Sequence, residues 1–341
     1  MALAGNVQAA EIRSVGPDGE AAVDASTIEL TDDQIAQIKE GGYTAAICLH
    51  YGGNDWSTSQ QKGLEDTFGE LGIEIVAVTD ANFSAETQVS NIETVMAKKP
   101  DILVSIPTDA TATADAYKQA AAAGIKIVFM DQRADGLEAG KDYVSVVSAD
   151  NYGNGYASGT VLGDALGGKG KVAMVYYDAN FAPTNQRDEG FRDAMKNYPD
   201  IEIVTEQGFT DESGCAEQGD AILTQFPNID GIYASWDVPM EGVLSAVRAA
   251  GMEGKVTLAC NDLGNNVARE IASGNIAGGG AQMPYDQGVA EAKLAALALL
   301  GEETPSYVAV PAETVTHENV LEAYTDVYHV ETPDWLKRKL M

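Results

Sequence analysis

The stretch from Ile102 to Asp131, ILVSIPTDATATADAYKQAAAAGIKIVFMD, contains a complete strand–helix–strand unit. Its first apolar run, Ile102–Ile106, is followed by an alanine-rich helical segment, Ala112–Ala123, and by a second apolar run, Ile125–Met130. Gly124 stands where the C-terminal cap of that helix is expected. Strands that are apolar throughout and alternate with amphipathic helices are typical of a parallel sheet covered on both faces. The stretch therefore predicts an α/β fold.

The same alternation extends in both directions along the chain. Before this stretch it gives the strands Ala45–Leu49 and Ile73–Thr79, with the helix Ser57–Leu71 between them. After Asp150 it restarts, and the predicted helices and strands follow in the order Tyr152–Leu166, Val172–Tyr177, Arg187–Tyr198, Ile201–Glu206, Cys215–Phe226, Gly231–Ala234, Gly242–Ala250, Val256–Cys260, Val267–Ser273, Ile276–Gln282 and Gln287–Leu300. The sequence thus predicts two doubly wound, Rossmann-like lobes of similar size.

We expect the chain to be divided into four parts, which are an N-terminal arm (1–42), lobe 1 (43–148 plus 283–311), lobe 2 (149–282 plus 312–330) and a C-terminal tail (331–341). A multi-strand hinge joins the lobes, and such pairs of lobes close around a ligand. In parallel sheets, ligands bind at the carboxyl ends of the strands. The cleft between the lobes is therefore the expected site.

The composition excludes several classes of function. With 52 Asp and Glu against 21 Lys and Arg, the 341-residue chain has a formal net charge of −31. Such a surface favours solubility and repels nucleic acids and anionic membranes. Residues 1–5 lack the features of a signal peptide, and no apolar stretch is long enough to span a bilayer. Either the protein is cytoplasmic or its export signal has been removed. The two-lobed fold favours removal, so we expect a periplasmic or extracellular, membrane-associated protein.

Residues for metal, cofactor or covalent chemistry are few. The three histidines and three cysteines have no metal-ligand spacing, and neither a Gly-x-Ser-x-Gly elbow nor a Cys–His pair is present. The segment from Gly167 to Lys171 precedes a strand, whereas a phosphate loop follows one, so it is predicted to be a helix-to-strand turn. A bridge between Cys215 and Cys260 is left open. The sequence predicts neither a metal nor a cofactor.

Polar and aromatic residues with no evident role in packing follow the predicted strands. They are His50, Asn54 and Trp56 after the first strand, Asp131, Gln132 and Arg133 after Ile125–Met130, Trp236 and Asp237 after Gly231–Ala234, and Asp262 and Gln282 farther along the chain. Carboxylates and amides bind pairs of hydroxyl groups, and aromatic rings cover the C–H faces of a sugar ring. For each Asp or Asn the alternative is an N-cap of the next helix. Together these residues predict a sugar site.

From about Thr44 to Val310 the chain resembles the periplasmic sugar-binding proteins of the ribose-binding type, whose fold is shared by the core of lactose-repressor-like regulators. The segments that carry the resemblance are Asn54-Asp-Trp, Pro107-Thr-Asp, Asp131, Ser148-Ala-Asp-Asn151, Arg187-Asp-Glu-Gly-Phe191, Asp262 and Gln282-Met-Pro-Tyr-Asp-Gln287. The resemblance implies that Asn54 and Trp56 contact a sugar from lobe 1. It also implies that Asp131 binds a hydroxyl pair and that Asp262 and Gln282 act from lobe 2 and the hinge.

The chain departs from the ribose pattern at several of these positions. Gln132 follows Asp131 where that pattern has an arginine, although Arg133 comes next. Asn185 stands where the family often has an arginine, and Arg187 is expected to brace its helix instead. Trp236 replaces the usual asparagine before Asp237. These departures predict a ligand other than ribose, namely another pentose, a hexose, a deoxysugar or a sugar alcohol.

The resemblance implies a monomeric sugar-capturing component of an ABC importer, which passes its ligand to a membrane permease and is not an enzyme. A sensory or regulatory sugar-binding protein on the same fold is the alternative. A repressor would carry a basic helix-turn-helix before the core, and residues 1–42 contain only Arg13 and Lys39 as basic residues. A sugar-active enzyme is the third class, and product formation from candidate sugars would distinguish it.

Overall fold

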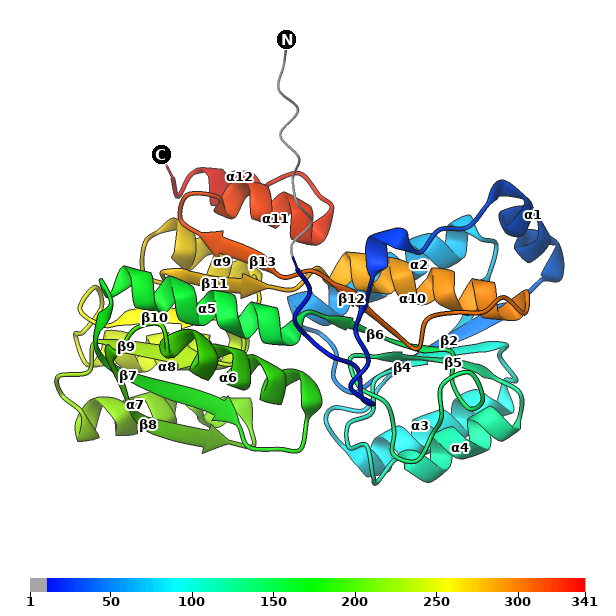
Figure 1. Ribbon diagram of the computed structural model, residues 1–341, viewed down its shortest axis with the longest axis horizontal. Helices are drawn as coiled ribbons and strands as arrows, with labels where there is room; N and C mark the ends of the chain where they lie inside the picture. The colour runs from blue at the N-terminus through cyan, green and yellow to red at the C-terminus, as the bar shows by residue number, and fades with distance from the viewer. Residues whose placement is uncertain (1–10, 341) are drawn as a thin grey trace, which may run out of the picture.

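The structure is a computed structural model that describes residues 11–340. Two lobes lie side by side, and each has a sheet between layers of helices (Figure 1). In lobe 1, seven strands are parallel throughout and lie in the order β1 (Val23–Asp24), β12 (Tyr307–Val310), β6 (Ser145–Ala149), β5 (Lys126–Met130), β4 (Ile102–Ser105), β2 (Thr44–Leu49) and β3 (Glu74–Asp80).

The central strands β2, β4, β5 and β6 of lobe 1 are buried, which explains their continuous apolar runs. Along β2, Ile47 and Leu49 belong to one core cluster, whereas Ala46 and Cys48 belong to the cluster on the opposite face. The helices of lobe 1 are α1 (Asp32–Gly41), α2 (Asp55–Glu70), α3 (Ala85–Ala97), α4 (Ala114–Ala122) and α10 (Pro284–Leu299).

Lobe 2 repeats this architecture with six strands, in the order β13 (Glu313–Thr316), β11 (Gly278–Ala281), β10 (Thr257–Cys260), β9 (Gly231–Ala234), β7 (Lys169–Tyr177) and β8 (Asp200–Phe209). Only the β11–β13 pair is antiparallel among the described strands. The helices of lobe 2 are α5 (Asn151–Ala165), α6 (Ala182–Met195), α7 (Cys215–Gln225), α8 (Asp237–Ala249), α9 (Asn265–Ala272), α11 (Val320–Tyr328) and α12 (Asp334–Lys337). The predicted fold class is confirmed.

The chain crosses between the lobes at three places, which are the junctions β6–α5, β11–α10 and β12–β13. The start of the described chain lies beside this hinge (Figure 1). Ser14 donates its backbone N–H to Asp150 at 2.8 Å, and Asp18 pairs with Arg133 at 2.7 Å. The predicted arm is thus attached to both lobes over its described part, and its first ten residues lie outside the described residues.

Details of the sequence predictions can be checked in the same structure. Gly124 follows the end of α4 with a positive φ of 87°, as a C-terminal cap requires. The turn that contains Gly167 joins α5 to β7, so the helix-to-strand prediction is confirmed. Cys215 and Cys260 are both free and buried, so they form no bridge.

Two glycines bring α5 and α6 into close contact in lobe 2. A Cβ atom at Gly155 would lie 1.8 Å from the carbonyl oxygen of Arg187, and one at Gly190 would lie 2.1 Å from that of Tyr152. No side chain fits at either point, because such distances are far shorter than van der Waals contact. The crossing of these helices therefore fixes where the backbone of Arg187 lies.

Candidate functional site

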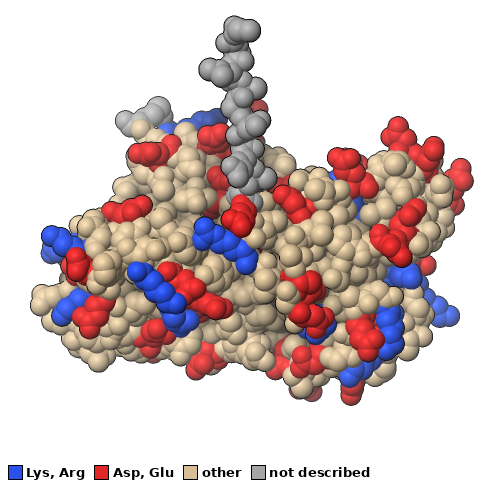
Figure 2. All heavy atoms as spheres, viewed as in Figure 1, with Lys and Arg blue, Asp and Glu red and all other residues tan. Residues whose placement is uncertain are grey.

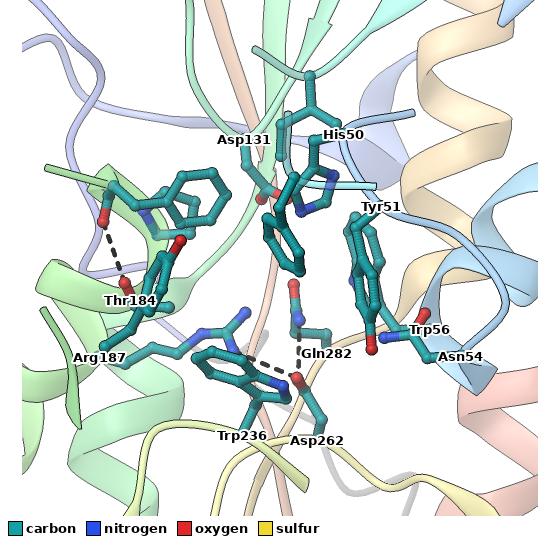
Figure 3. A pocket seen from close by; sticks show the side chains of 15 residues that line it. His50, Tyr51, Asn54, Trp56, Asp131, Thr184, Arg187, Trp236, Asp262 and Gln282 are labelled. Atoms are coloured by element: carbon teal, nitrogen blue, oxygen red, sulfur yellow. Dashed lines mark hydrogen bonds and ion pairs between the residues drawn. The ribbon is translucent and has the colours of Figure 1, made fainter. Parts of the chain in front are cut away.

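A cavity lies between the lobes where the carboxyl ends of the two sets of strands meet (Figure 3). About 480 Å³ of space not filled by atoms lies within it, including open solvent at its mouth. Lobe 1 contributes His50, Tyr51, Asn54, Trp56, Phe83, Ile106 and Asp131, and lobe 2 with its junctions contributes Tyr177, Phe181, Pro183, Thr184, Arg187, Trp236, Asp262 and Gln282.

The segment after β2 places four of these side chains in the cavity, namely His50, Tyr51, Asn54 and Trp56. Asn54 is the N-cap of α2, and its Oδ1 accepts a hydrogen bond from the backbone N–H of Ser57 at 2.8 Å. The N-cap alternative therefore holds for Asn54, which lines the cavity as well. Because the cap fixes the start of α2, the first turn of the helix carries Trp56 into the cavity. Gly53, with φ of 86°, provides the bend before the cap.

Asp131 follows β5 directly and adopts a left-handed backbone conformation, with φ of 54°. A residue in such a strained conformation persists only where the surrounding structure fixes it, and strained residues are common at functional sites. The Oδ1 atom of Asp131 accepts hydrogen bonds from Ser148 Oγ at 2.9 Å, from the Ala149 N–H at 3.3 Å and from Gln287 Nε2 at 3.3 Å. Burial raises the pKa of this carboxyl group, although the charge of Arg187 opposes the shift.

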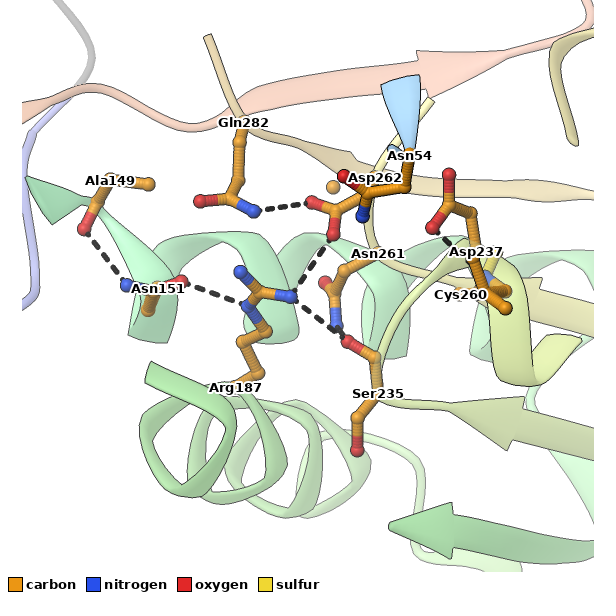
Figure 4. A network of polar contacts seen from close by, with 12 residues as sticks. Asn54, Ala149, Asn151, Arg187, Ser235, Asp237, Cys260, Asn261, Asp262 and Gln282 are labelled. Atoms are coloured by element: carbon orange, nitrogen blue, oxygen red, sulfur yellow. Dashed lines mark hydrogen bonds and ion pairs between the residues drawn. The ribbon is translucent and has the colours of Figure 1, made fainter. Parts of the chain in front are cut away.

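Asp262 lies at the corresponding place in lobe 2, with φ of 69°. Its Oδ2 accepts from Arg187 Nη1 at 3.2 Å and its Oδ1 accepts from Gln282 Nε2 at 2.8 Å (Figure 4). The side chains of Arg187 and Asp262 are only 6% and 10% exposed. This is a buried ion pair that the protein itself has completed, and it fixes Gln282 at the hinge.

Asn151, at the start of α5, links the two aspartate networks across the hinge. Its Oδ1 accepts from Arg187 Nε at 2.8 Å, and its Nδ2 lies 3.4 Å from Asp131 Oδ1. The carboxylates of both lobes are therefore held by one continuous chain of hydrogen bonds. The segment from Ser148 to Asn151, which carried part of the sequence resemblance, holds the side chains of Asp131 and Arg187 in place by hydrogen bonds.

Three polar atoms of the lining residues are buried and have no hydrogen-bond partner within the described chain. They are His50 Nδ1, Trp56 Nε1 and Gln282 Oε1. An unpaired buried polar atom costs about 1–3 kcal/mol, so native structures rarely leave several together. Burial lowers the pKa of His50 to about 3, so its imidazole is neutral near pH 7. These three side chains of the cavity wall thus carry neutral donors and acceptors.

Aromatic rings from both lobes form the rest of the wall. His50 stacks on Phe181 across the cleft with ring centroids 5.5 Å apart, and Tyr177 meets Trp236 edge to face at 5.6 Å. Rings of this kind cover apolar C–H faces of a ligand while hydrogen bonds fix its hydroxyl groups. The site therefore combines apolar walls with a few polar groups that converge.

The structure brings seven of the eleven predicted site residues together and leaves four outside the cavity. The seven are His50, Asn54, Trp56, Asp131, Trp236, Asp262 and Gln282. Arg133 turns away to pair with Asp18, and Gln132 donates to the carbonyl oxygen of Pro107 at 2.8 Å. Asp237 begins α8, and burial and the charge of Asp262 raise its pKa well above the ordinary value.

The fourth residue, Asn185, is exposed on the outer side of α6. Arg187, and not Asn185, lines the cavity from this helix. Arg187 braces α6 against Asn151 and Asp262, as expected, and it lines the cavity as well. The helical period decides this, because Thr184 and Arg187 share the inward face of α6 and Asn185 does not. That period was available in the sequence and would have found both residues.

The other lining residues that sequence reasoning missed are mainly aromatic, namely Tyr51, Phe83, Tyr177 and Phe181, together with Ile106 and Pro183. Most of them lie in loops after strands, where no periodic pattern marks a direction. Within residues 11–340, no three His, Cys, Asp or Glu side chains form a group that could hold a metal ion. None of the described helices is long and apolar enough to cross a membrane.

Comparisons with known proteins agree with this geometry. The family model for the periplasmic binding protein domain matches residues 45–303. The D-ribose/D-allose-binding protein of Pseudomonas aeruginosa is 29% identical over 273 residues, which are 77% of this chain and 83% of that protein. The ribose import binding protein of Bacillus subtilis is 27% identical over 213 residues, covering 62% of this chain and 67% of that protein.

Two solved structures extend the comparison. An ABC transporter periplasmic solute-binding protein of Actinobacillus succinogenes with bound D-allose has a TM-score of 0.75 at 29% identity, over 82% of this chain and 99% of the other. A solute-binding protein of Agrobacterium vitis bound to α-D-tagatopyranose has a TM-score of 0.78 at 26% identity, over 86% of this chain and all of the other. The resemblance found in the sequence is confirmed, and the chain belongs to the periplasmic binding protein family of the ribose-binding type.

Proposed function

We propose that this protein binds one neutral monosaccharide or sugar alcohol between its lobes and releases it unaltered. The observation that carries the proposal is the set of three buried, unpartnered atoms on residues that line the cavity, His50 Nδ1, Trp56 Nε1 and Gln282 Oε1. Sugar hydroxyl groups both donate and accept, so a single ring with several of them satisfies such a mixed set.

The charges around the cavity favour a neutral ligand. Arg187 is the one cationic side chain among the lining residues that the structure describes, and Asp262 already pairs with it. A carboxylate or phosphate on the ligand would face Asp131 and Asp262 without a free cation to balance it, and buried unpaired charges are costly. Sugar acids and sugar phosphates are therefore poor candidates.

The relatives support the same class of ligand. Their names and bound molecules include D-ribose, D-allose and tagatose. We infer that ribose is not the preferred ligand here, because Trp236 contributes an aromatic wall and the predicted site residue Arg133 lies outside the cavity. An allose-like hexose, another pentose or a sugar alcohol remains.

We further propose that the protein acts as a monomer in the periplasm or outside the cell, and that it delivers its sugar to the permease of an ABC importer. The matched relatives are binding proteins and import components, which supports a role without catalysis. Asp and Glu side chains are scattered over both lobes with Lys and Arg among them, as Figure 2 shows for one face. Such a surface suits a dispersed protein.

A thermal-shift screen against D-ribose, D-allose, D-tagatose, D-arabinose, myo-inositol and D-glucuronate tests the proposal. A compound that binds only the folded state raises the melting temperature by mass action. We expect a rise with at least one neutral compound and none with D-glucuronate. The rise should vanish in Trp56→Ala and persist in Asn185→Ala, whose side chain lies outside the cavity. A flat response to every neutral compound would refute the proposal.

A further inference from the structure

Helix α9 of lobe 2 begins without a cap of its own. Its N-cap residue is Gly264, which has no side chain to accept a hydrogen bond from the first turn. The first four N–H groups of any helix lack partners within the helix, and side chains such as Asp usually supply one. The start of α9 thus needs an acceptor from elsewhere.

Asp55 of lobe 1 supplies that acceptor across the cleft. Its Oδ2 accepts from the backbone N–H of Asn265 at 2.7 Å, and its Oδ1 accepts from the side-chain Nδ2 of the same residue at 2.7 Å. Tyr324 of α11 donates to Asn265 Oδ1 at 2.7 Å, so the partner side chain is itself held in place. A carboxylate at a helix N-terminus is also favoured by the helix dipole.

Packing within lobe 2 requires glycine at position 264. A Cβ atom there would lie 2.0 Å from Asp237 Oδ2 of the same lobe, and also 3.3 Å from Asp55 Oδ2 of lobe 1. Position 264 therefore cannot carry a capping side chain, and the acceptor for the first turn of α9 comes from lobe 1.

The capping residue lies between two residues of the cavity. Asn54 and Trp56 both line the cavity, whereas Asp55 points to lobe 2 from the same turn. At the other end of this loop, Tyr51 contacts Glu212 of lobe 2 through its hydroxyl group at 3.2 Å. One short segment of lobe 1 thus touches both the ligand site and the opposite lobe.

We propose that Asp55 is a positioning residue that caps α9 only when the lobes are closed, and so determines how long a bound sugar is retained. The inference rests on the proposed function, because it describes the closed state of the same site. Asp55 does not itself line the cavity. Its effect on binding is therefore expected to appear in dissociation and not in association.

Stopped-flow binding of D-allose, D-tagatose and myo-inositol to the Asp55→Ala variant tests this expectation. Loss of a cap and its charge corresponds to about a tenfold faster dissociation rate, with the association rate unchanged within about twofold. Asp55→Asn keeps one acceptor oxygen and should fall between Asp55→Ala and the unaltered protein. Glu65→Ala is the matched control, because Glu65 is exposed on α2 and bonds only to Gln61 among the described residues.

Hydrogen exchange gives a second readout that a merely structural role would not move. In the unaltered protein, sugar should slow exchange in the first turn of α9, although that turn does not line the cavity. In Asp55→Ala this protection should be lost, while the melting temperature of the sugar-free protein stays the same. Unchanged dissociation rates and unchanged α9 protection in Asp55→Ala would overturn the inference.

Cross-linking separates this inference from the proposed function. In the variant with Asp55→Cys and Asn265→Cys, a short thiol-specific cross-linker should join the two positions. In the variant with Glu65→Cys and Asn265→Cys it should not. Cross-linking in a protein that binds none of the three compounds would support the lobe contact and count against the proposed ligand class. Failure to cross-link with or without these compounds would overturn the contact itself.

Discussion

Asp131 in lobe 1 and Asp262 in lobe 2 occupy equivalent places but are held by different chemistry. Each lies beyond the carboxyl end of a parallel strand in a left-handed conformation, with φ of 54° and 69°. Neutral hydroxyl and amide donors surround Asp131, whereas the guanidinium of Arg187 pairs with Asp262. The comparison indicates that lobe 1 offers a carboxylate whose charge is poorly compensated, and lobe 2 offers one that is already neutralised.

This difference predicts opposite costs when the charges are removed. At Asp131, burial works against the charged form and raises the pKa, so a neutral replacement relieves a desolvation penalty. At Asp262, a neutral replacement leaves the buried guanidinium of Arg187 without its counter-charge. Removing one partner of a buried pair is far more costly than removing one partner at the surface.

The largest effect is expected from Asp262→Ala. The variant should lose about 3 kcal/mol of unfolding free energy, because Arg187 stays buried without a partner, and it should bind no sugar. Urea unfolding and calorimetric titration measure the two effects. Glu206→Ala breaks the exposed pair with Arg192 and is the matched control, with an expected loss of about 1 kcal/mol or less. Equal losses in the two variants would contradict the comparison.

Asp131→Asn should separate binding from stability. The amide keeps one acceptor oxygen for Ser148 and Ala149, so the unfolding free energy at pH 7 should not fall. Affinity for the sugar should drop about 10- to 100-fold, since a hydrogen bond to a charged group contributes about 1.5–3 kcal/mol. Calorimetry with urea unfolding on the same sample checks both. A loss of stability as large as in Asp262→Ala would show that the two aspartates are equivalent after all.

The position of Arg187 can be disturbed without touching its side chain. Gly155→Ala places a methyl group against the Arg187 carbonyl oxygen and should cost about 1–3 kcal/mol of unfolding free energy by overpacking. Binding should weaken as well, because α6 shifts with Arg187. Gly69→Ala, in α2, meets nothing within 4 Å and should instead stabilise the protein by about 0.5–1 kcal/mol. Chemical denaturation measures the unfolding free energy of both variants. An unchanged unfolding free energy in Gly155→Ala would refute the close contact.

A smaller effect is expected in the dependence of stability on pH. Burial raises the pKa of Asp188, beside Ser235 in lobe 2, from its ordinary 3.8 to about 6. Between these values the folded state binds more protons at this group than the unfolded state does, so its contribution to stability declines as pH rises toward 6. Asp188→Asn should remove that decline and be at least as stable as the unaltered protein at pH 7. The unfolding free energy of both proteins is measured across this pH range. If the two profiles run parallel, the pKa of Asp188 is ordinary and the prediction is wrong.

Much of the fold was predictable from the sequence because its signals are local. Short, continuously apolar runs such as Ile102–Ile106 identify strands that are buried on both faces, and the Gly124 cap identifies the end of a helix. The site was predictable wherever a residue directly follows a strand, as Asp131 does. Parallel topology alone brings such residues to one edge of a sheet.

The rest of the site depends on contacts that no local pattern contains. Arg133 lies two residues beyond Asp131 but turns to Asp18, a partner far away in the chain. Phe181 reaches the cavity because the lobes meet there, with His50 stacked against it. Arg187 is the exception, since the helical period of α6 already placed it on the inward face. The residue types of the site could be predicted from the sequence. The direction in which each loop runs and the contacts between the lobes could not.

A crystal structure grown with the neutral sugar or polyol that gives the largest thermal shift would show whether one sugar ring binds between the lobes. We expect density for one ring there, with hydroxyl oxygens about 3 Å from His50 Nδ1, Trp56 Nε1 and Gln282 Oε1. The carboxylates of Asp131 and Asp262 should contact the same ring. Density for the sugar outside this cavity, or an empty cavity in crystals saturated with it, would show that this cavity is not the sugar site.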